Sequence, residues 1–237
     1  MDFSLSAADS QDLRLAQEGR EKTRDSWFFL FWPLLGLRYV LIERFIIPER
    51  YYEVHCALDD VIPFLEWFVI PYGLWYVFIA GMHLYTYFFD KQAFQRYSRF
   101  LITAFSISTL TFLLFPTCQN LRPTEFPRDN IFTDIVRLLY RMDTNTNVCP
   151  SEHVIGSIAA FLAVLDTKRL RKPGWIALFG VVALFTSIAT VFLKQHSFVD
   201  VIAALPVCLA AYLLCCRRER KPIGQLEQRG LRKKRFL

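Results

Sequence analysis

The chain has 237 residues, of which 54% are hydrophobic and 16% aromatic, and its formal net charge is +6. A soluble domain of this length could not bury so many apolar side chains in its core, so the composition argues against a soluble protein and favours an integral membrane protein. The basic excess does not indicate a nucleic-acid partner, because the Lys and Arg residues flank apolar segments, as membrane topology requires.

Residues 1–26 are polar and charged, and they lack the short apolar stretch after a basic start that marks a cleavable signal peptide. We therefore expect a cytoplasmic N-terminal segment here, either a surface helix or disordered, before a first span that is retained as an anchor. A helix needs roughly 17 to 25 apolar residues to cross the hydrocarbon core. Six apolar windows approach or meet this length, and the fourth is short: residues 27–47, 62–89, 100–115, 153–165, 175–193 and 199–216.

The distribution of Lys and Arg tests this map, since cytoplasmic loops carry an excess of them. With the N-terminus inside, 20 of the 28 basic residues fall on the cytoplasmic side. The sequence therefore predicts an all-α polytopic protein with a six-helix membrane domain over residues 27–216 and a basic cytoplasmic tail over residues 217–237. We expect the tail to contact anionic lipids. The expected location is a bacterial inner membrane, with the site facing the periplasm or exterior.

Polar residues at membrane depth are costly, so function is best sought where they gather. On the predicted outer side they occupy residues 50–60, 116–151 and 194–200. Glu66, near the start of the second window, either faces a shared cavity, where it would bind substrate, or extends its carboxylate to the interface. Cys118 and Cys149 on this side either form a disulfide or are inert buried thiols, and the cysteine spacing does not indicate a metal site.

The segment "HSFVD" places His196 four residues before Asp200. On a helix this spacing puts both side chains on one face. The carboxylate would accept the imidazole Nδ1 proton and leave Nε2 as a nucleophile suited to attack on phosphorus. Ser197 with Asp200 also reads as a capping box at the start of the sixth span, and the two interpretations are compatible.

The segment "PSEH" precedes the fourth apolar window. Ser151 is a good N-cap, and the free N–H groups of a first helical turn attract anions. His153 lies within that turn, where it would act as a general acid beside a bound phosphate or serve as an ordinary interfacial histidine. Arg122, followed by Pro123, offers a guanidinium that matches phosphate oxygens.

In this order, Arg122-Pro123, Pro150-Ser151-x-His153 and His196-x-x-x-Asp200 resemble the three motifs of the type 2 phosphatidic acid phosphatase superfamily. That superfamily includes vanadium haloperoxidases and glucose-6-phosphatase and, more distantly, sphingomyelin and inositol-phosphorylceramide synthases. The resemblance covers residues 100–216. The chain departs from the family's Lys, Gly and Ser-Arg at these positions: Phe115, Glu152, Ala189 and Thr190. Lys194 is the first candidate to replace one of the missing cations, followed by Arg128 and Arg141.

The resemblance implies a cofactor-free, metal-independent reaction on a lipid phosphate ester or pyrophosphate. His196 would attack phosphorus, Asp200 would orient it, and His153 would protonate the leaving alcohol, while Arg122, Lys194 and Ser151 would bind the phosphate. Resolution by water makes the protein a phosphatase, and resolution by an alcohol makes it a headgroup phosphotransferase. The apolar surroundings suit a phospholipid, isoprenoid phosphate or sphingolipid precursor. A non-enzymatic transporter, scramblase or adaptor is the rival class.

Overall fold

The computed structural model describes residues 25–215, so the expectations for the N-terminal segment before Asp25 and for the basic tail lie outside it. The chain divides into two compact units, residues 1–47 and 48–237. The described part of the first unit contains a 3-10 helix, η1 (Trp27–Leu30), which continues into α2 (Phe31–Arg44). The boundary between the two units follows residue 47, so it falls inside the membrane domain predicted over residues 27–216, directly after the first apolar window.

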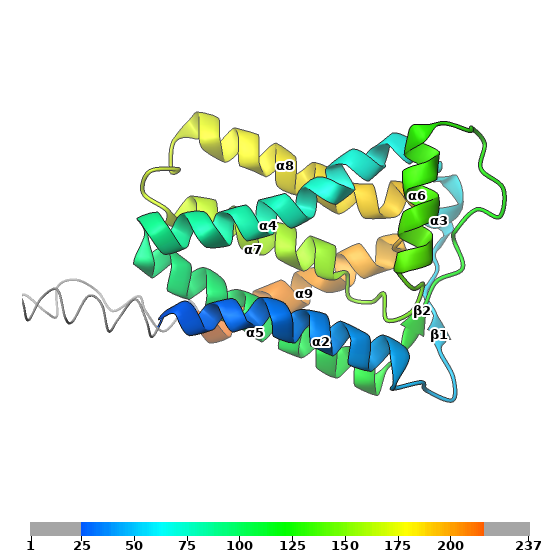
Figure 1. Cartoon of the computed structure of the whole chain (residues 1–237), viewed down its shortest axis with the longest axis horizontal. Coiled ribbons are helices and arrows are strands. Elements are labelled where there is room, and N and C mark those ends of the chain that lie inside the picture. Colours follow the sequence, from blue (N-terminus) through cyan, green and yellow to red (C-terminus); the bar gives the residue numbers. More distant parts are fainter. Residues whose placement is uncertain (1–24, 216–237) are drawn as a thin grey trace, which may run out of the picture. The chain divides into compact units, whose positions relative to one another are not determined.

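The second unit is a helical bundle with a small sheet at one end (Figure 1). Two short strands, β1 (Tyr52–Glu53) and β2 (Thr117–Cys118), pair in parallel. The helices are α3 (Ala57–Val61), η2 (Glu66–Phe68), α4 (Val69–Phe89), α5 (Lys91–Leu114), α6 (Ile131–Met142), α7 (Glu152–Asp166), α8 (Pro173–Phe192) and α9 (Phe198–Cys215).

Within residues 25–215, four helical segments are long and apolar enough to cross a membrane, namely residues 66–89, 91–114, 173–192 and 198–215. The first and fourth predicted windows contain shorter helices, α2 with 14 residues and α7 with 15. The described chain is thus mostly helical, and its four helices of membrane-spanning length and polarity indicate a membrane protein.

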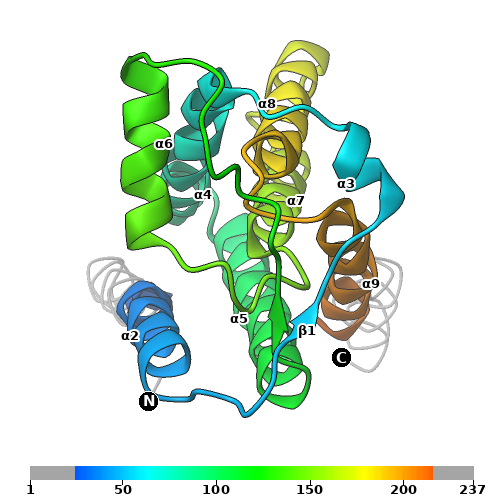
Figure 2. The ribbon, with the colours of Figure 1, turned by 90° about the vertical axis from the view of Figure 1, so that its right-hand side faces the viewer.

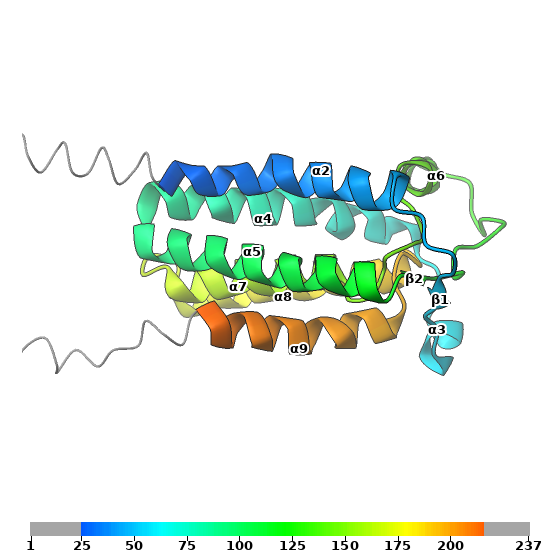
Figure 3. The same cartoon turned by 90° about the horizontal axis from the view of Figure 1, so that it is seen from below.

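Helix α7 lies inside the bundle, where it packs against α4, α5, α8 and α9. Its buried positions include small residues, Gly156, Ala159, Ala160 and Ala163, which let neighbouring helices approach closely. Ser157 adds a hydrogen bond of 2.8 Å to Thr186 of α8. Figure 3 shows α5 and α9, which also pack together, along one side of the bundle.

Helix α5 begins at Lys91, well before the apolar window predicted at residue 100. The side chain of Asp90 caps it by accepting a hydrogen bond from the Ala93 N–H at 3.1 Å. Arg96 in its polar first turns pairs with Asp166 at the end of α7, at 2.9 Å. Hydropathy could not predict that α5 begins at Lys91, because the cap by Asp90 and the ion pair with distant Asp166 stabilise this start.

The predicted long loop, residues 116–151, contains a helix that the sequence reading missed, α6. Asn130 caps it by accepting from the N–H groups of Phe132 and Thr133. The helix lies across the end of the bundle instead of along the long helices (Figures 1 and 2). It is too short for a span, so a search for spans passed over it.

Candidate functional site

The structure brings together the two histidines that the motifs single out. His153 lies in the first turn of α7 and His196 in the loop between α8 and α9. Their ring centroids are 5.8 Å apart. The backbone joins the two segments directly, since the Ser151 N–H donates to the Asp200 carbonyl at 3.1 Å. The pair lies at the end of the bundle that carries α3, α6 and the strands.

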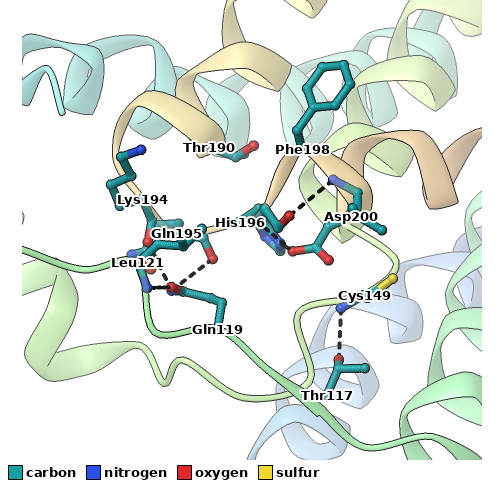
Figure 4. A network of polar contacts seen from close by, with 12 residues as sticks. Thr117, Gln119, Leu121, Cys149, Thr190, Lys194, Gln195, His196, Phe198 and Asp200 are labelled. Atoms are coloured by element: carbon teal, nitrogen blue, oxygen red, sulfur yellow. Dashed lines mark hydrogen bonds and ion pairs between the residues drawn. The ribbon is translucent and has the colours of Figure 1, made fainter. Parts of the chain in front are cut away.

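Asp200 holds both His196 and the start of α9 (Figure 4). Its Oδ2 is 3.2 Å from Nδ1 of His196 and accepts the Ser197 N–H at 2.9 Å. Ser197 Oγ in turn accepts from the Val199 N–H at 3.2 Å. Capping and histidine pairing therefore occur together. The His196 side chain is 11% exposed and that of Asp200 is fully buried.

The end of α8 positions His196 through a Schellman motif. The N–H of Lys194 donates to the Val191 carbonyl, and that of Gln195 to the Thr190 carbonyl. The His196 N–H also donates to Thr190, at 3.1 Å. Lys194 takes the left-handed position that usually holds glycine, with φ of 52°. A lysine here needs support from its side chain, because a Cβ makes this conformation unfavourable.

The side chain of Lys194 supplies that support and points away from His196 (Figure 4). Its Nζ donates to the carbonyls of Asp59 and Ile62, both at 2.6 Å. Burial lowers the pKa of Lys194, against the raising effect of Asp59 and Asp60. The ammonium of Lys194 is thus bound to carbonyls at the end of α3. Its role in phosphate binding stays a prediction.

Asp59 is a positioning residue for the His196 loop. Its carboxylate accepts from Ser197 Oγ at 2.6 Å, from the Phe198 N–H at 2.8 Å and from the Cys56 N–H at 2.8 Å. Burial alone would raise the pKa of Asp59, but these hydrogen bonds outweigh it and lower the pKa below its usual value. The Asp59 side chain is buried and binds the loop.

Aromatic side chains of α4 surround His153. The rings of Tyr72 and Trp75 each lie 4.4 Å from its ring, and that of Tyr76 lies at 6.2 Å. The Trp75 indole N–H donates to the His153 carbonyl at 2.8 Å. This approach requires Gly156, since a Cβ there would lie 2.7 Å from the Trp75 ring. The contact of these rings with His153 was not predicted, because a run of aromatic residues on an apolar helix does not indicate which residue it contacts.

Ser151 occupies the N-cap position of α7, as predicted, but its hydroxyl makes no capping hydrogen bond. Within residues 25–215, neither Ser151 Oγ nor His153 Nε2 has a hydrogen-bond partner, although both atoms are buried. A buried polar atom without a partner costs about 1–3 kcal/mol. Both atoms lie beside the first turn of α7, where the backbone N–H groups and the helix dipole favour an anion.

Arg122 reaches the site through Gln195, the residue before His196. Its Nη2 donates to Gln195 Oε1 at 2.5 Å and to the Thr144 carbonyl at 2.6 Å. Its Nη1 donates to the carbonyls of Tyr140 and Asp143, at 3.3 and 3.1 Å. The guanidinium thus joins the end of α6 to the His196 loop and places a positive charge behind it.

The hydrogen bonds of Glu66 join it to residues near the start of α6, and not to the histidines. Its carboxylate forms two hydrogen bonds with Arg128, of 2.6 and 2.7 Å, and one of 3.0 Å with Asn130. The Glu66 side chain is 2% exposed, whereas that of Arg128 is 47% exposed. The pair fastens the start of α6 to η2, so the structure gives Glu66 an anchoring contact, and its role with substrate stays a prediction.

Strand β2 and the residues after it hold both motif segments in place, a function that sequence reasoning missed. The Thr117 carbonyl accepts from the Asn147 N–H at 2.6 Å, and Thr117 Oγ1 accepts from the Cys149 N–H at 3.1 Å. Buried Gln119 donates to the Lys194 carbonyl at 2.9 Å (Figure 4). A strand of two residues thereby sets the separation of the segments that carry the histidines.

The cysteines near the site are free thiols, and Cys118 and Cys149 are not joined in a disulfide. Burial, together with the charge of Asp200 and a hydrogen bond to it, raises the pKa of Cys149 to about 12. The thiol therefore stays protonated at neutral pH and is a poor nucleophile.

The described part of the chain is a helical protein with four helices of membrane-spanning length and a His-His-Asp cluster at one end of its bundle. In comparisons with known proteins, no family model, no curated protein and no solved structure matches this chain.

Proposed function

We propose that the protein is an integral-membrane lipid phosphatase that cleaves a phosphomonoester or pyrophosphate through a phosphohistidine on His196. The observation that carries the proposal is the 5.8 Å separation of the His153 and His196 rings, with Asp200 bound to His196 Nδ1. The motif resemblance to the type 2 phosphatidic acid phosphatase superfamily supports the same chemistry. The substrate would be a phospholipid, an isoprenoid phosphate or a sphingolipid precursor.

In the first step, His196 Nε2 attacks phosphorus and the bond between phosphorus and the leaving oxygen breaks. His153 gives its proton to that oxygen, and the lipid alcohol or phosphate departs. Asp200 stabilises the positive charge that develops on the His196 ring. In the second step, water attacks the phosphohistidine, His153 takes its proton, the P–N bond breaks, and phosphate leaves.

The two histidine rings lie close enough to reach the same phosphoryl group. A nucleophile in attack position lies about 3–3.5 Å from phosphorus, and a general acid lies about 2.6–3.2 Å from the oxygen it protonates. With centroids 5.8 Å apart in an edge-to-face arrangement, the two rings are nearly in contact, so they would have to separate to admit a phosphoryl group. The buried Ser151 hydroxyl and the first N–H groups of α7 would bind the phosphoryl oxygens, and Arg122 would add positive charge through Gln195.

The alternative acceptor is an alcohol, which would make the protein a headgroup phosphotransferase. The rings of Tyr72 and Trp75 against His153 favour it, because they restrict water around a phosphohistidine. A transporter or scramblase is less favoured. The polar groups of a transporter would lie near the membrane midplane, whereas the histidines and Asp200 of this protein lie at one end of the bundle.

In the proposed topology, α2 and α7 complete six spans and both termini are cytoplasmic. The basic residues between α7 and α8, Lys168, Arg169, Arg171 and Lys172, lie at the opposite end of the bundle from the histidines (Figure 1). An excess of Lys and Arg on the cytoplasmic side would then put the site on the outer membrane face. A bacterial inner membrane with the site toward the periplasm fits this orientation.

The test is to incubate the purified protein, in lipid nanodiscs, with a panel of labelled phospholipids and isoprenoid phosphates, with and without candidate alcohols. We expect free phosphate from at least one substrate, and a new lipid instead if an alcohol is the acceptor. His196→Asn should lower turnover by at least about a thousandfold. Acid and alkaline quenching should reveal a protein-bound phosphate that is stable in alkali and lost in acid.

His55→Asn is the matched control, since His55 is half-exposed and its imidazole bonds to exposed Asp60 at 2.8 Å. This variant should turn over substrate at the normal rate. Full turnover by the His196 variant would overturn the proposed mechanism. Loss of turnover in both variants would point to a general effect of removing a histidine.

A further inference from the structure

Helix α6 has three distinct faces. One packs on the core formed by α4, α8 and η2, through Phe132, Thr133, Val136, Leu139 and Tyr140. A second is charged and carries Asp134, Arg137 and Arg141. The third is apolar and exposed, and it consists of Ile131, Ile135, Leu138 and Met142. We call this third set the outer stripe of α6.

The outer stripe is too regular and too exposed to be incidental. Its residues recur at intervals of four, three and four, so at about 100° per residue they fall within an arc of about 60°. Their exposed fractions are 66% for Ile131, 43% for Ile135, 55% for Leu138 and 67% for Met142. The face already packed on the core is a different one, so core formation does not account for the stripe.

The outer stripe begins where the apolar outer face of α4 begins. Trp67, Ile70, Leu74 and Val77 are exposed at helical spacing along this candidate span. Asn130, which caps α6, donates to Glu66 Oε1 at 3.0 Å, and the Arg128 guanidinium lies 4.9 Å from the Trp67 ring centre. Arg and Trp side chains are typical of the membrane–water interface. The start of α6 is therefore fastened to the end of a span at that depth.

The orientation of α6 agrees with this depth. The helix lies across the end of the bundle, so if the long helices cross the bilayer, α6 runs along its surface (Figures 1 and 2). Arg137 on the charged face pairs with Asp129 and Asp134, both at 2.8 Å. A helix with an apolar face beside a charged face is the pattern of helices that lie in the interface of a bilayer.

We propose that the outer stripe of α6 inserts into the boundary between lipid headgroups and acyl chains, on the membrane surface that carries the histidines. The occupant of this face is thus the bilayer itself. The opposite side of α6 reaches the site: Tyr140 Oη donates to the Leu193 carbonyl at 2.6 Å, and Arg122 binds carbonyls at the end of the helix. Contact of α6 with lipid would then stabilise the end of α8, which leads to His196.

The test places the photoreactive residue p-benzoylphenylalanine at Ile135 or at Leu138 in the full-length protein, reconstituted in phosphatidylcholine–phosphatidylglycerol nanodiscs. The matched control carries it at Arg141, which is exposed on the charged face of the same helix. After irradiation, intact-protein mass spectrometry separates a lipid adduct from unmodified protein, and denaturing electrophoresis reveals crosslinked dimers.

We expect lipid adducts at both stripe positions, several-fold more abundant than at Arg141. Dimers in place of lipid adducts would assign the stripe to a second copy of the chain, and lipid adducts no more abundant at the stripe than at Arg141 would show that the stripe does not face lipid. Either result overturns the proposal. The measurement needs no turnover, so repeating it with His196→Asn separates the placement of α6 from the proposed chemistry.

Discussion

Gly156→Ala tests how closely α4 approaches α7 beside His153. The added Cβ would lie 2.7 Å from Cζ2 and 2.9 Å from Nε1 of Trp75. Reaching ordinary contact at 3.4 Å requires the indole to move by about 0.7 Å. Trp75 is 5% exposed, so it has little room for this movement. The displacement also disturbs its hydrogen bond to the His153 carbonyl.

Gly81→Ala provides the matched control, because a Cβ at this position in α4 has nothing within 4 Å. Both replacements gain about 1 kcal/mol of helix propensity. The difference between the variants therefore reports overpacking, about 1–3 kcal/mol, and the disturbed hydrogen bond, about 0.5–1.5 kcal/mol. We expect Gly156→Ala to be less stable than Gly81→Ala by about 1.5–4.5 kcal/mol.

The assay is thermal or denaturant unfolding of both variants in the same nanodiscs, followed by turnover of the substrate that the panel identifies. A shift of the His153 ring should lower turnover in Gly156→Ala by up to about a hundredfold, with no change in Gly81→Ala. Equal stability and equal turnover of the two variants would refute the close contact between Trp75 and α7.

Two further predictions concern buried carboxylates. Asp59→Asn leaves one donor of the His196 loop without an acceptor, so the free energy of unfolding should fall by about 1–3 kcal/mol and turnover with it, whereas exposed Asp60→Asn should change neither. Because the pKa of Asp59 is lowered on folding, its stabilisation is present above the unfolded value of about 4 and is lost as pH falls through the folded pKa. Unfolding curves across that range should show this acid sensitivity in the wild type and not in Asp59→Asn. Arg128→Ala strands the buried Glu66 carboxylate and should destabilise the protein more than Glu66→Gln, which leaves a half-exposed guanidinium in water. Equal losses in unfolding would contradict the burial assigned to this pair.

The helices could be read from the sequence because apolar runs of span length have one stable arrangement of their backbone groups in lipid. Each of the six predicted windows contains a helix, and four helical segments have membrane-spanning length and polarity. The pairing of His196 with Asp200 was predicted from helical spacing. The pair forms, but His196 lies in the loop before α9, and the Asp200 carboxylate reaches back to it from the first turn of that helix. Helix α6 and the early start of α5 were missed because caps and distant partners stabilise them.

The partners of the remaining polar residues depended on packing between segments far apart in the chain. Lys194 looked like a phosphate ligand from its place beside His196, yet its ammonium reaches the end of α3. Glu66 bonds to Arg128, and Asp59 bonds to Ser197 and Phe198. Each of these side chains has several candidate partners in the sequence, and only the three-dimensional arrangement selects one.

By itself, the sequence determined the helical character of this protein and the order of its His-containing motifs, because hydropathy and helical periodicity are local properties. Tertiary structure alone decided that α7 lies within the bundle, that β2 and Gln119 hold both motif segments, and that aromatic rings of α4 enclose His153. The physical reason is that burial and hydrogen bonding between distant residues depend on how helices pack, and packing is a property of the whole bundle.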